Sequence, residues 1–147
     1  MLTGVVATVL VVVTPGAGQV VPFPAGFRTH RIPTNGTTLF VRTGGVGPAV
    51  VLLTRGGEGS SAYGRQASAS AEAPKVDVVD TVGAGDAFMS GTLAWLYHNE
   101  RLEATRLAEL SSEALAELLR YAGRTSALTV SRAGADPPTE SELAAFL

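Results

Sequence analysis

Cysteine is absent from the 147 residues, and Lys75 is the only lysine. Without cysteine the chain has no disulfide framework, no thiolate metal site and no cysteine nucleophile. The formal net charge of −2 leaves no basic surface for nucleic acid and no polybasic patch for a membrane. His30 and His98 lie far apart in the sequence, so we expect no histidine metal cluster. We therefore expect neither nucleic acid nor a membrane as a partner.

A long hydrophobic run is also missing. The most apolar segment, residues 4–13, has ten residues, whereas a helix needs about 20 to cross a bilayer. The three residues before it carry no basic side chain, which argues against a secretory signal. We therefore predict a buried strand there and place the protein in the cytoplasm.

The length suits about one domain, and 46% apolar residues are enough for a hydrophobic core. The 17 glycines and 8 prolines indicate that many turns interrupt the elements around this core. One of these turns, Asn35-Gly36, lies between two β-type segments, residues 29–32 and 38–41. This pattern predicts a hairpin with a two-residue turn.

The segment that organises the chain runs from Asp80 to Phe88. It follows the β-branched residues 76–79 and precedes an apolar segment, residues 88–97, that favours a helix. The predicted order is therefore strand, glycine turn, helix. Such a turn leaves the first backbone N–H groups of the helix unpaired, and their partial positive charge attracts an anion.

Four residues of this turn suit phosphoryl transfer to a hydroxyl. Gly83 and Gly85 let the backbone come close to a ligand, and Ala84 adds only a methyl group. The carboxylate of Asp86 could take the hydroxyl proton while the backbone amides hold the developing charge. The spacing alone also allows an ordinary connection between strand and helix, with Asp80 or Asp86 as a helix cap.

The nonapeptide D-T-V-G-A-G-D-A-F resembles the C-terminal signature of the PfkB (ribokinase-like) carbohydrate kinases, and the resemblance extends over residues 49–147. It implies transfer of the γ-phosphate of ATP, with Mg²⁺, to a hydroxyl of a sugar such as fructose or ribose. It also implies that Asp86 is the catalytic base and that Gly83, Ala84 and Gly85 form the anion hole.

A second glycine segment follows the apolar residues 50–53, which we predict to be a buried strand. Its residues allow a plain turn, but Thr-x-Gly-x-x-Gly also resembles the nucleotide loop of the PfkB family. That resemblance implies that ATP lies along Thr54, Gly56, Gly57 and Gly59, and that Gly123 offers only backbone contact beside the adenine. We expect a return strand at residues 60–64 and an exposed connection at residues 66–73.

The segment from Leu128 to Ala135 resembles the closing loop of the same family, which implies a monovalent cation such as K⁺. The implied ligands are one carboxylate and four backbone carbonyls, from Asp80, Val82, Thr129, Arg132 and Gly134.

Helical periodicity covers residues 102–110 and 113–128, with Ser111 or Ser112 as the N-cap between them. The pattern of Thr139 and Glu142 is a capping box and predicts a short final helix with Leu143, Phe146 and Leu147 facing inward.

Together these patterns predict an α/β fold with a mostly parallel sheet flanked by helices, the C-terminal part of a ribokinase-like fold. Residues 1–48, a strand and a hairpin, would form an atypical N-terminal segment, and residues 49–147 the nucleotide-binding and catalytic portion. Nothing in residues 1–50 resembles the sugar site of the family. The first functional hypothesis is a truncated ATP-dependent sugar kinase whose site is completed by a second copy, as a homodimer, or by a missing N-terminal half. The alternative is an inactive nucleotide-binding or interaction fragment.

Overall fold

The computed structural model describes residues 26–34, 36–44 and 47–146, and the chain divides into two units. The first unit is Met1–Ala49 and the second is Val50–Leu147. The strand predicted at residues 4–13 lies outside the described residues.

In the described part of the first unit, β1 (Arg28–Thr34) and β2 (Thr37–Thr43) form an antiparallel hairpin. Thr34 pairs with Thr37, so the turn has two residues, as predicted. Gly36 has φ +74°, the left-handed conformation that favours glycine in such turns. The hairpin prediction is confirmed.

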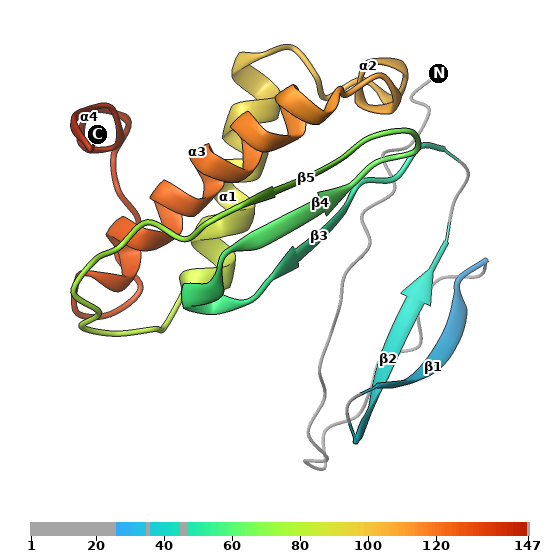
Figure 1. The fold of residues 1–147 in the computed structure, drawn as a ribbon, viewed down its shortest axis with the longest axis horizontal. Helices are drawn as coiled ribbons and strands as arrows, with labels where there is room; N and C mark the ends of the chain where they lie inside the picture. Colours follow the sequence, from blue (N-terminus) through green and yellow to red (C-terminus); the bar gives the residue numbers. More distant parts are fainter. Residues whose placement is uncertain (1–25, 35, 45–46, 147) are drawn as a thin grey trace. The chain divides into compact units, whose positions relative to one another are not determined.

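The second unit contains a three-stranded sheet in the order β3-β4-β5 (Figure 1). The strands are β3 (Val51–Thr54), β4 (Ser60–Tyr63) and β5 (Ser68–Ala71), and a 3-10 turn, η1 (Gly56–Glu58), joins the first two. The return strand predicted after the glycine loop is therefore confirmed as β4. Both pairs in this sheet are antiparallel, and so is the hairpin of the first unit. The predicted mostly parallel sheet is not found among the described residues.

The prediction of a strand at residues 76–79 is wrong. This segment has no strand beside it in the described structure, and the amides of Val79 and Asp80 both donate to the carbonyl of Val130, at 2.8 and 3.2 Å. A strand requires a ladder of such bonds, and β-branched residues alone cannot supply the neighbouring backbone.

Two further predictions about this sheet are wrong. The Ala/Ser-rich residues 66–73 contain β5 rather than an exposed connection, with Ala69 and Ala71 half-buried. Their weak intrinsic strand preference is overridden because α3 packs directly on β5. In β3, Val51 is 54% and Leu53 46% exposed, so this strand is covered on one face and not on both.

The helices of the second unit are α1 (Ala84–His98), α2 (Ala104–Ala108), α3 (Ser112–Val130) and α4 (Glu140–Ala145). Each corresponds to a predicted helical segment. Ser111 is the N-cap of α3, since its hydroxyl accepts a hydrogen bond from the amide of Ala114 at 3.2 Å. No helix in the described ranges is both long and apolar enough to span a membrane.

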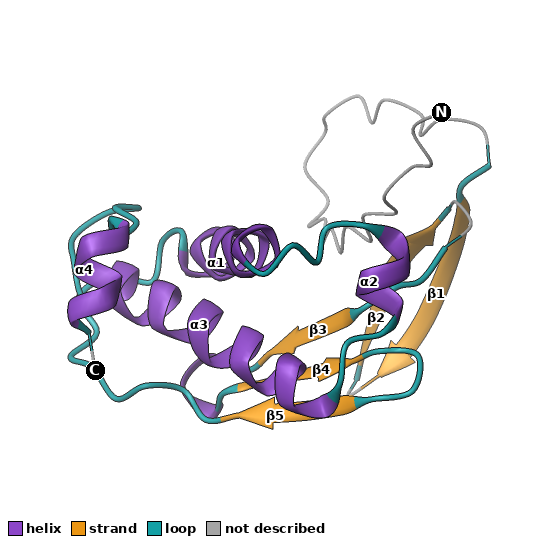
Figure 2. Ribbon diagram, turned by 90° about the horizontal axis from the view of Figure 1, so that it is seen from above, coloured by secondary structure: helices purple, strands orange, loops and turns teal. Residues whose placement is uncertain are grey.

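Helix α3 lies between the sheet and α1, with β4 and β5 on one side and α1 on the other (Figure 2). The core forms along both contacts and is made of nine buried residues: Ala62, Phe88, Trp95, Leu96, Leu110, Leu115, Leu118, Leu119 and Ala122. Gly91 lets the two helices approach closely, because an added Cβ would lie 2.6 Å from the hydroxyl oxygen of Thr125. This packing fixes the N-terminus of α1 beside the C-terminal half of α3.

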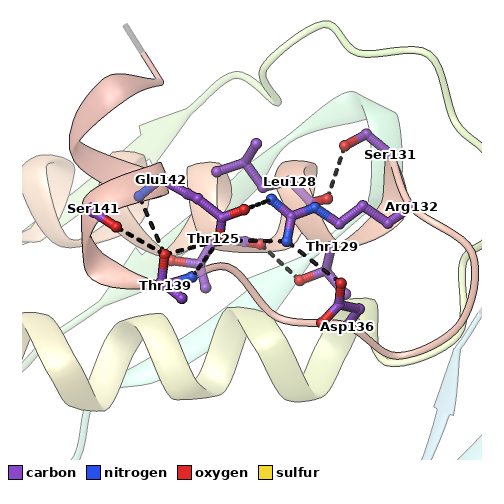
Figure 3. Close-up of polar contacts among 9 residues, drawn as sticks. All are labelled: Thr125, Leu128, Thr129, Ser131, Arg132, Asp136, Thr139, Ser141 and Glu142. Atoms are coloured by element: carbon purple, nitrogen blue, oxygen red, sulfur yellow. Dashed lines mark hydrogen bonds and ion pairs between the residues drawn. The ribbon is translucent and has the colours of Figure 1, made fainter.

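The segment after α3 is held by a polar network centred on Arg132 and Glu142 (Figure 3). The Arg132 guanidinium donates to Glu142 at 2.6 Å and pairs with Asp136 at 3.5 Å. Thr139 and Glu142 form the predicted capping box of α4, with the Thr139 amide donating to the Glu142 carboxylate at 2.8 Å. The hydrogen bond from the Thr139 amide, and then those from Arg132 and the Thr139 hydroxyl, lower the pKa of Glu142 to about 2. The predicted inward position of Leu143 is also confirmed.

Candidate active site

The glycine turn opens α1 with free backbone donors. Gly83 is the N-cap residue and has φ +78°. The Ala84 amide donates to the Thr81 carbonyl at 3.3 Å, and the helical ladder begins where the Ala87 amide donates to Gly83 at 2.8 Å. The amides of Gly85 and Asp86 lie between these two bonds, in the first turn, where a helix offers no acceptor. These are the N–H groups that an anion can use.

Both the backbone conformation and the space around position 83 require glycine there. Its left-handed φ strains any residue with a side chain, and an added Cβ would lie 2.8 Å from the Cβ of Ala135. Gly85 differs, because it has ordinary helical φ and an added Cβ would meet nothing within 4 Å. Gly83 therefore shapes the turn, whereas Gly85 keeps space open in front of it.

A cleft of about 690 Å³ lies in front of this turn, within the second unit, and its volume is in the range of small-ligand sites. Four segments line it: the loop after β3, residues 72–78, the glycine turn and one face of α3. Seven of the residues that the sequence predicts to bind phosphate or nucleotide are among its lining residues: Thr54, Gly56, Gly57, Gly59, Ala84, Gly85 and Gly123. The fold thus brings the glycine loop after β3, the glycine turn and Gly123 of α3 to the same cleft.

The loop after β3 keeps its form through backbone contacts. The Arg55 amide donates to the Gly59 carbonyl at 2.9 Å, closing the loop around η1. Gly59 has φ +96°, and an added Cβ would collide with the carbonyl oxygen of Ala71 in β5. Gly57 has open space at its Cα, so the backbone there is accessible from the cleft.

Sequence reasoning missed two walls of the cleft. One is the segment that carries Pro74, Lys75 and Val76, and the other is the face of α3 that carries Ser126 and Val130. Ser126 and Val130 follow Gly123 at helical spacing, three and seven residues later. That spacing is the sequence signal by which this wall could have been found.

Asp86 lies outside the cleft. It is exposed in the first turn of α1, and no hydrogen bond or ion pair from the described residues engages its carboxylate. Since a helix turns by about 100° per residue, the Asp86 side chain leaves α1 well around the axis from Gly85. Asp86 makes no capping bond. The carboxylate that engages the turn is that of Asp80, which accepts a hydrogen bond from the Val82 amide at 3.0 Å.

Three of the five residues predicted to bind a cation, Asp80, Val82 and Gly134, meet at the junction between the turn and the loop after α3. The second carboxylate oxygen of Asp80 accepts from the Gly134 amide at 3.0 Å, and the bonds from Val82 and Gly134 lower the pKa of Asp80. The Thr129 carbonyl accepts from the Arg132 amide at 3.2 Å, and the Gly134 carbonyl from Asp136 at 3.0 Å. Oxygen donors of this kind suit a hard cation, although amides already occupy several of them. The described residues hold no cluster of three or more His, Asp or Glu side chains arranged for a metal.

A glycine loop and a helix N-terminus without a side-chain cap line one cleft, an arrangement that suits an anionic ligand. Residues 41–142 match the model of the pfkB family of carbohydrate kinases. The chain belongs to this family.

The proteins that this chain resembles include several fructokinases. A fructokinase of Rhizobium leguminosarum bv. trifolii is 41% identical over 69 residues, which are 47% of this chain and 21% of the relative. The crystal structure of a Xylella fastidiosa fructokinase with bound ATP is 30% identical and matches 66% of this chain and 31% of that one, with a TM-score of 0.61. A Vibrio cholerae fructokinase bound to fructose, ADP and calcium is 26% identical over 67% of this chain and 30% of that one, with a TM-score of 0.52.

These comparisons establish the family and the ribokinase-like fold of the matched part. The chain spans about a fifth to a third of the length of these relatives.

Proposed function

We propose that this chain carries the nucleotide-binding and catalytic portion of an ATP-dependent sugar kinase, with a fructose- or ribose-like hydroxyl as the acceptor. The observation that supports it best is the cleft itself. Its lining joins Gly56 and Gly59 of one motif to Ala84 and Gly85 of the other and to Gly123 of α3. The known relatives act on sugars, and one was solved with ATP, which supports the same assignment.

Phosphoryl transfer depends mainly on positioning and on stabilisation of negative charge. The Gly85 and Asp86 amides and the positive end of the α1 dipole suit the phosphates of ATP, to which Mg²⁺ would be bound. An exposed carboxylate without a partner in the described structure is free to accept a proton, so Asp86 is the proposed base for the acceptor hydroxyl. K⁺ held by Asp80 and the neighbouring carbonyls would add positive charge behind the turn.

The acceptor must approach Asp86, and Asp86 is exposed and is not among the residues that line the cleft. The proposed kinase therefore needs further surface on that side of α1. Met89, Leu93 and Tyr97 lie on α1 at four-residue steps and are 46%, 52% and 68% exposed. Such an apolar stripe suits burial against another protein surface, either a second copy of this chain or a separate N-terminal half.

The same stripe favours a second candidate, a nucleotide-binding or interaction protein without turnover. That protein would bind ATP in the cleft but would lack the surface that holds an acceptor in line with the γ-phosphate. Nucleotide binding is common to both candidates, and phosphoryl transfer separates them.

Binding of ATP is tested by the shift in melting temperature of the purified chain with ATP and Mg²⁺. We expect stabilisation by ATP that is lost in Gly85→Val, because the valine side chain fills the space in front of the amides. Ala144→Val is the matched control, since it adds a β-branched residue at an exposed position of α4 away from the cleft. A wild-type chain that ATP does not stabilise, or a Gly85→Val chain that ATP stabilises equally, would contradict the proposed site.

A further inference from the structure

Ser126 of α3 contacts the glycine turn through a hydrogen bond from its side chain. Its hydroxyl donates to the carbonyl oxygen of Ala84 at 3.0 Å, between positions that are 42 residues apart in the sequence. Ser126 is half-buried and also lines the cleft. The contact joins α3 to the first residue of α1.

The bonded carbonyl belongs to the peptide group that ends in the Gly85 amide. A trans peptide group is planar, and its C=O and N–H bonds point in opposite directions. A donor that fixes the Ala84 carbonyl therefore also fixes the direction of the Gly85 N–H. Polarisation through the same group makes that N–H a stronger donor, since linked hydrogen bonds reinforce one another.

Ala84 is the first residue of α1, so its carbonyl also accepts the Phe88 amide in the helical ladder, and the Ser126 hydroxyl is a second donor to the same oxygen. The N-cap position is Gly83, and no side chain caps α1. Gly85 itself has no Cβ and has open space at its Cα, so its own packing does not restrain it. The Ser126 hydroxyl supplies, from α3, the side-chain bond to this peptide group, and the Gly85 N–H stays free because the bond is made to the carbonyl.

We propose that Ser126 is a positioning residue for phosphate binding: it holds the Ala84–Gly85 peptide group so that the Gly85 N–H faces the nucleotide. The inference rests on the proposed function, because it assumes that the cleft binds a nucleotide with its phosphates at the turn. It concerns this chain's own contact between α3 and α1, and it assigns Ser126 a role in affinity for the phosphates and none in affinity for the base.

The test compares Ser126→Ala with wild type in titrations with adenosine and with ADP. Loss of one neutral hydrogen bond should weaken ADP binding roughly 2- to 10-fold and leave adenosine binding unchanged. Ser126→Thr keeps the hydroxyl and should restore ADP affinity. Ser131→Ala is the matched control, because its hydroxyl donates to the Leu128 carbonyl at 2.8 Å, outside the cleft. Equal losses for adenosine and ADP, or an equal loss in the control, would overturn the proposal.

A second measurement tests the hydrogen bond between Ser126 and Ala84 in the absence of any ligand. In amide NMR spectra of the nucleotide-free chain, the Gly85 resonance should move in Ser126→Ala and stay in place in Ser131→Ala, because only the first change removes a bond to its peptide group. An unmoved Gly85 resonance overturns the positioning role by itself. A wild-type chain that binds neither ADP nor ATP contradicts the proposed function instead, so the two failures are distinguishable.

Discussion

The carboxylate of Asp80 bonds the amide of Gly134, which lies 54 residues further along the chain, at 3.0 Å. Through its other oxygen the same carboxylate bonds the Val82 amide, so one side chain joins the glycine turn to the loop after α3. The free N–H groups of the turn and the C-terminal end of α3 are thereby held in one arrangement.

Asp80→Asn should lower the melting temperature, because an amide side chain has one acceptor oxygen where the carboxylate has two. Either the Val82 or the Gly134 amide then loses its partner. Asp77→Asn is the control, since Asp77 is exposed and makes no hydrogen bond in the described structure. Differential scanning calorimetry of both variants checks the prediction, and equal melting temperatures for them would show that the Asp80 contacts do not hold the turn.

Stability should fall in acid, and Glu142 should account for part of the fall. Its pKa in the folded chain is lowered from 4.5 to about 2, so its contribution is present above about pH 4.5 and is lost as the pH falls toward 2. Glu142→Gln should therefore be less stable than wild type at neutral pH and should approach it near pH 2. Urea unfolding at several pH values measures the difference. Glu140→Gln is the control on the same helix, and a constant Glu142→Gln deficit across this range would contradict the linkage.

The two glycines of the turn should respond in opposite ways to alanine. Gly83→Ala places a Cβ at left-handed φ and against Ala135, and should destabilise the chain by about 1–2 kcal/mol. Gly85→Ala has helical φ and open space, so it should stabilise α1 by up to about 1 kcal/mol while weakening ATP binding. Chemical unfolding and ATP titration of each variant check this pairing. Similar stability changes in both variants would contradict the distinct geometry of the two positions.

The general-base assignment predicts a selective effect of Asp86→Asn. Where turnover is measurable, the rate should fall at least about 100-fold with nucleotide affinity nearly unchanged, since the side chain lies outside the cleft. Steady-state kinetics and ATP titration of the variant separate the two quantities. Comparable turnover in wild type and Asp86→Asn would contradict the role of Asp86 as the general base.

The chain alone should be a poor kinase. Without a surface over Asp86, water reaches the γ-phosphate and the acceptor is not held in line. A coupled ADP assay with ATP, Mg²⁺, K⁺ and a panel of ketoses and aldoses should give less than about 1 s⁻¹, the low end for kinases. Faster turnover would show that the chain builds an acceptor pocket, by itself or as an oligomer.

Features that depend on neighbours in the sequence could be predicted from it. The nonapeptide identified the family, and the caps at Ser111 and Thr139 marked two helix starts, because each cap bonds an amide three residues later. The hairpin turn at Asn35-Gly36 could be predicted for the same reason, because it too depends on residues that are adjacent in the sequence. The motifs also predict that Thr54, Gly59 and Gly85 share one site, and all three line the cleft.

Features that depend on distant partners were decided only by the tertiary structure. Residues 76–79 have the composition of a strand but lack a neighbouring strand in the described structure, whereas Ser68–Ala71 form a strand because β4 and α3 lie beside them. The wall of α3 at Ser126 faces the glycine turn only after α1 and α3 pack through Gly91. Strand pairing and cleft walls arise from contacts across tens of residues, which local sequence preference does not encode.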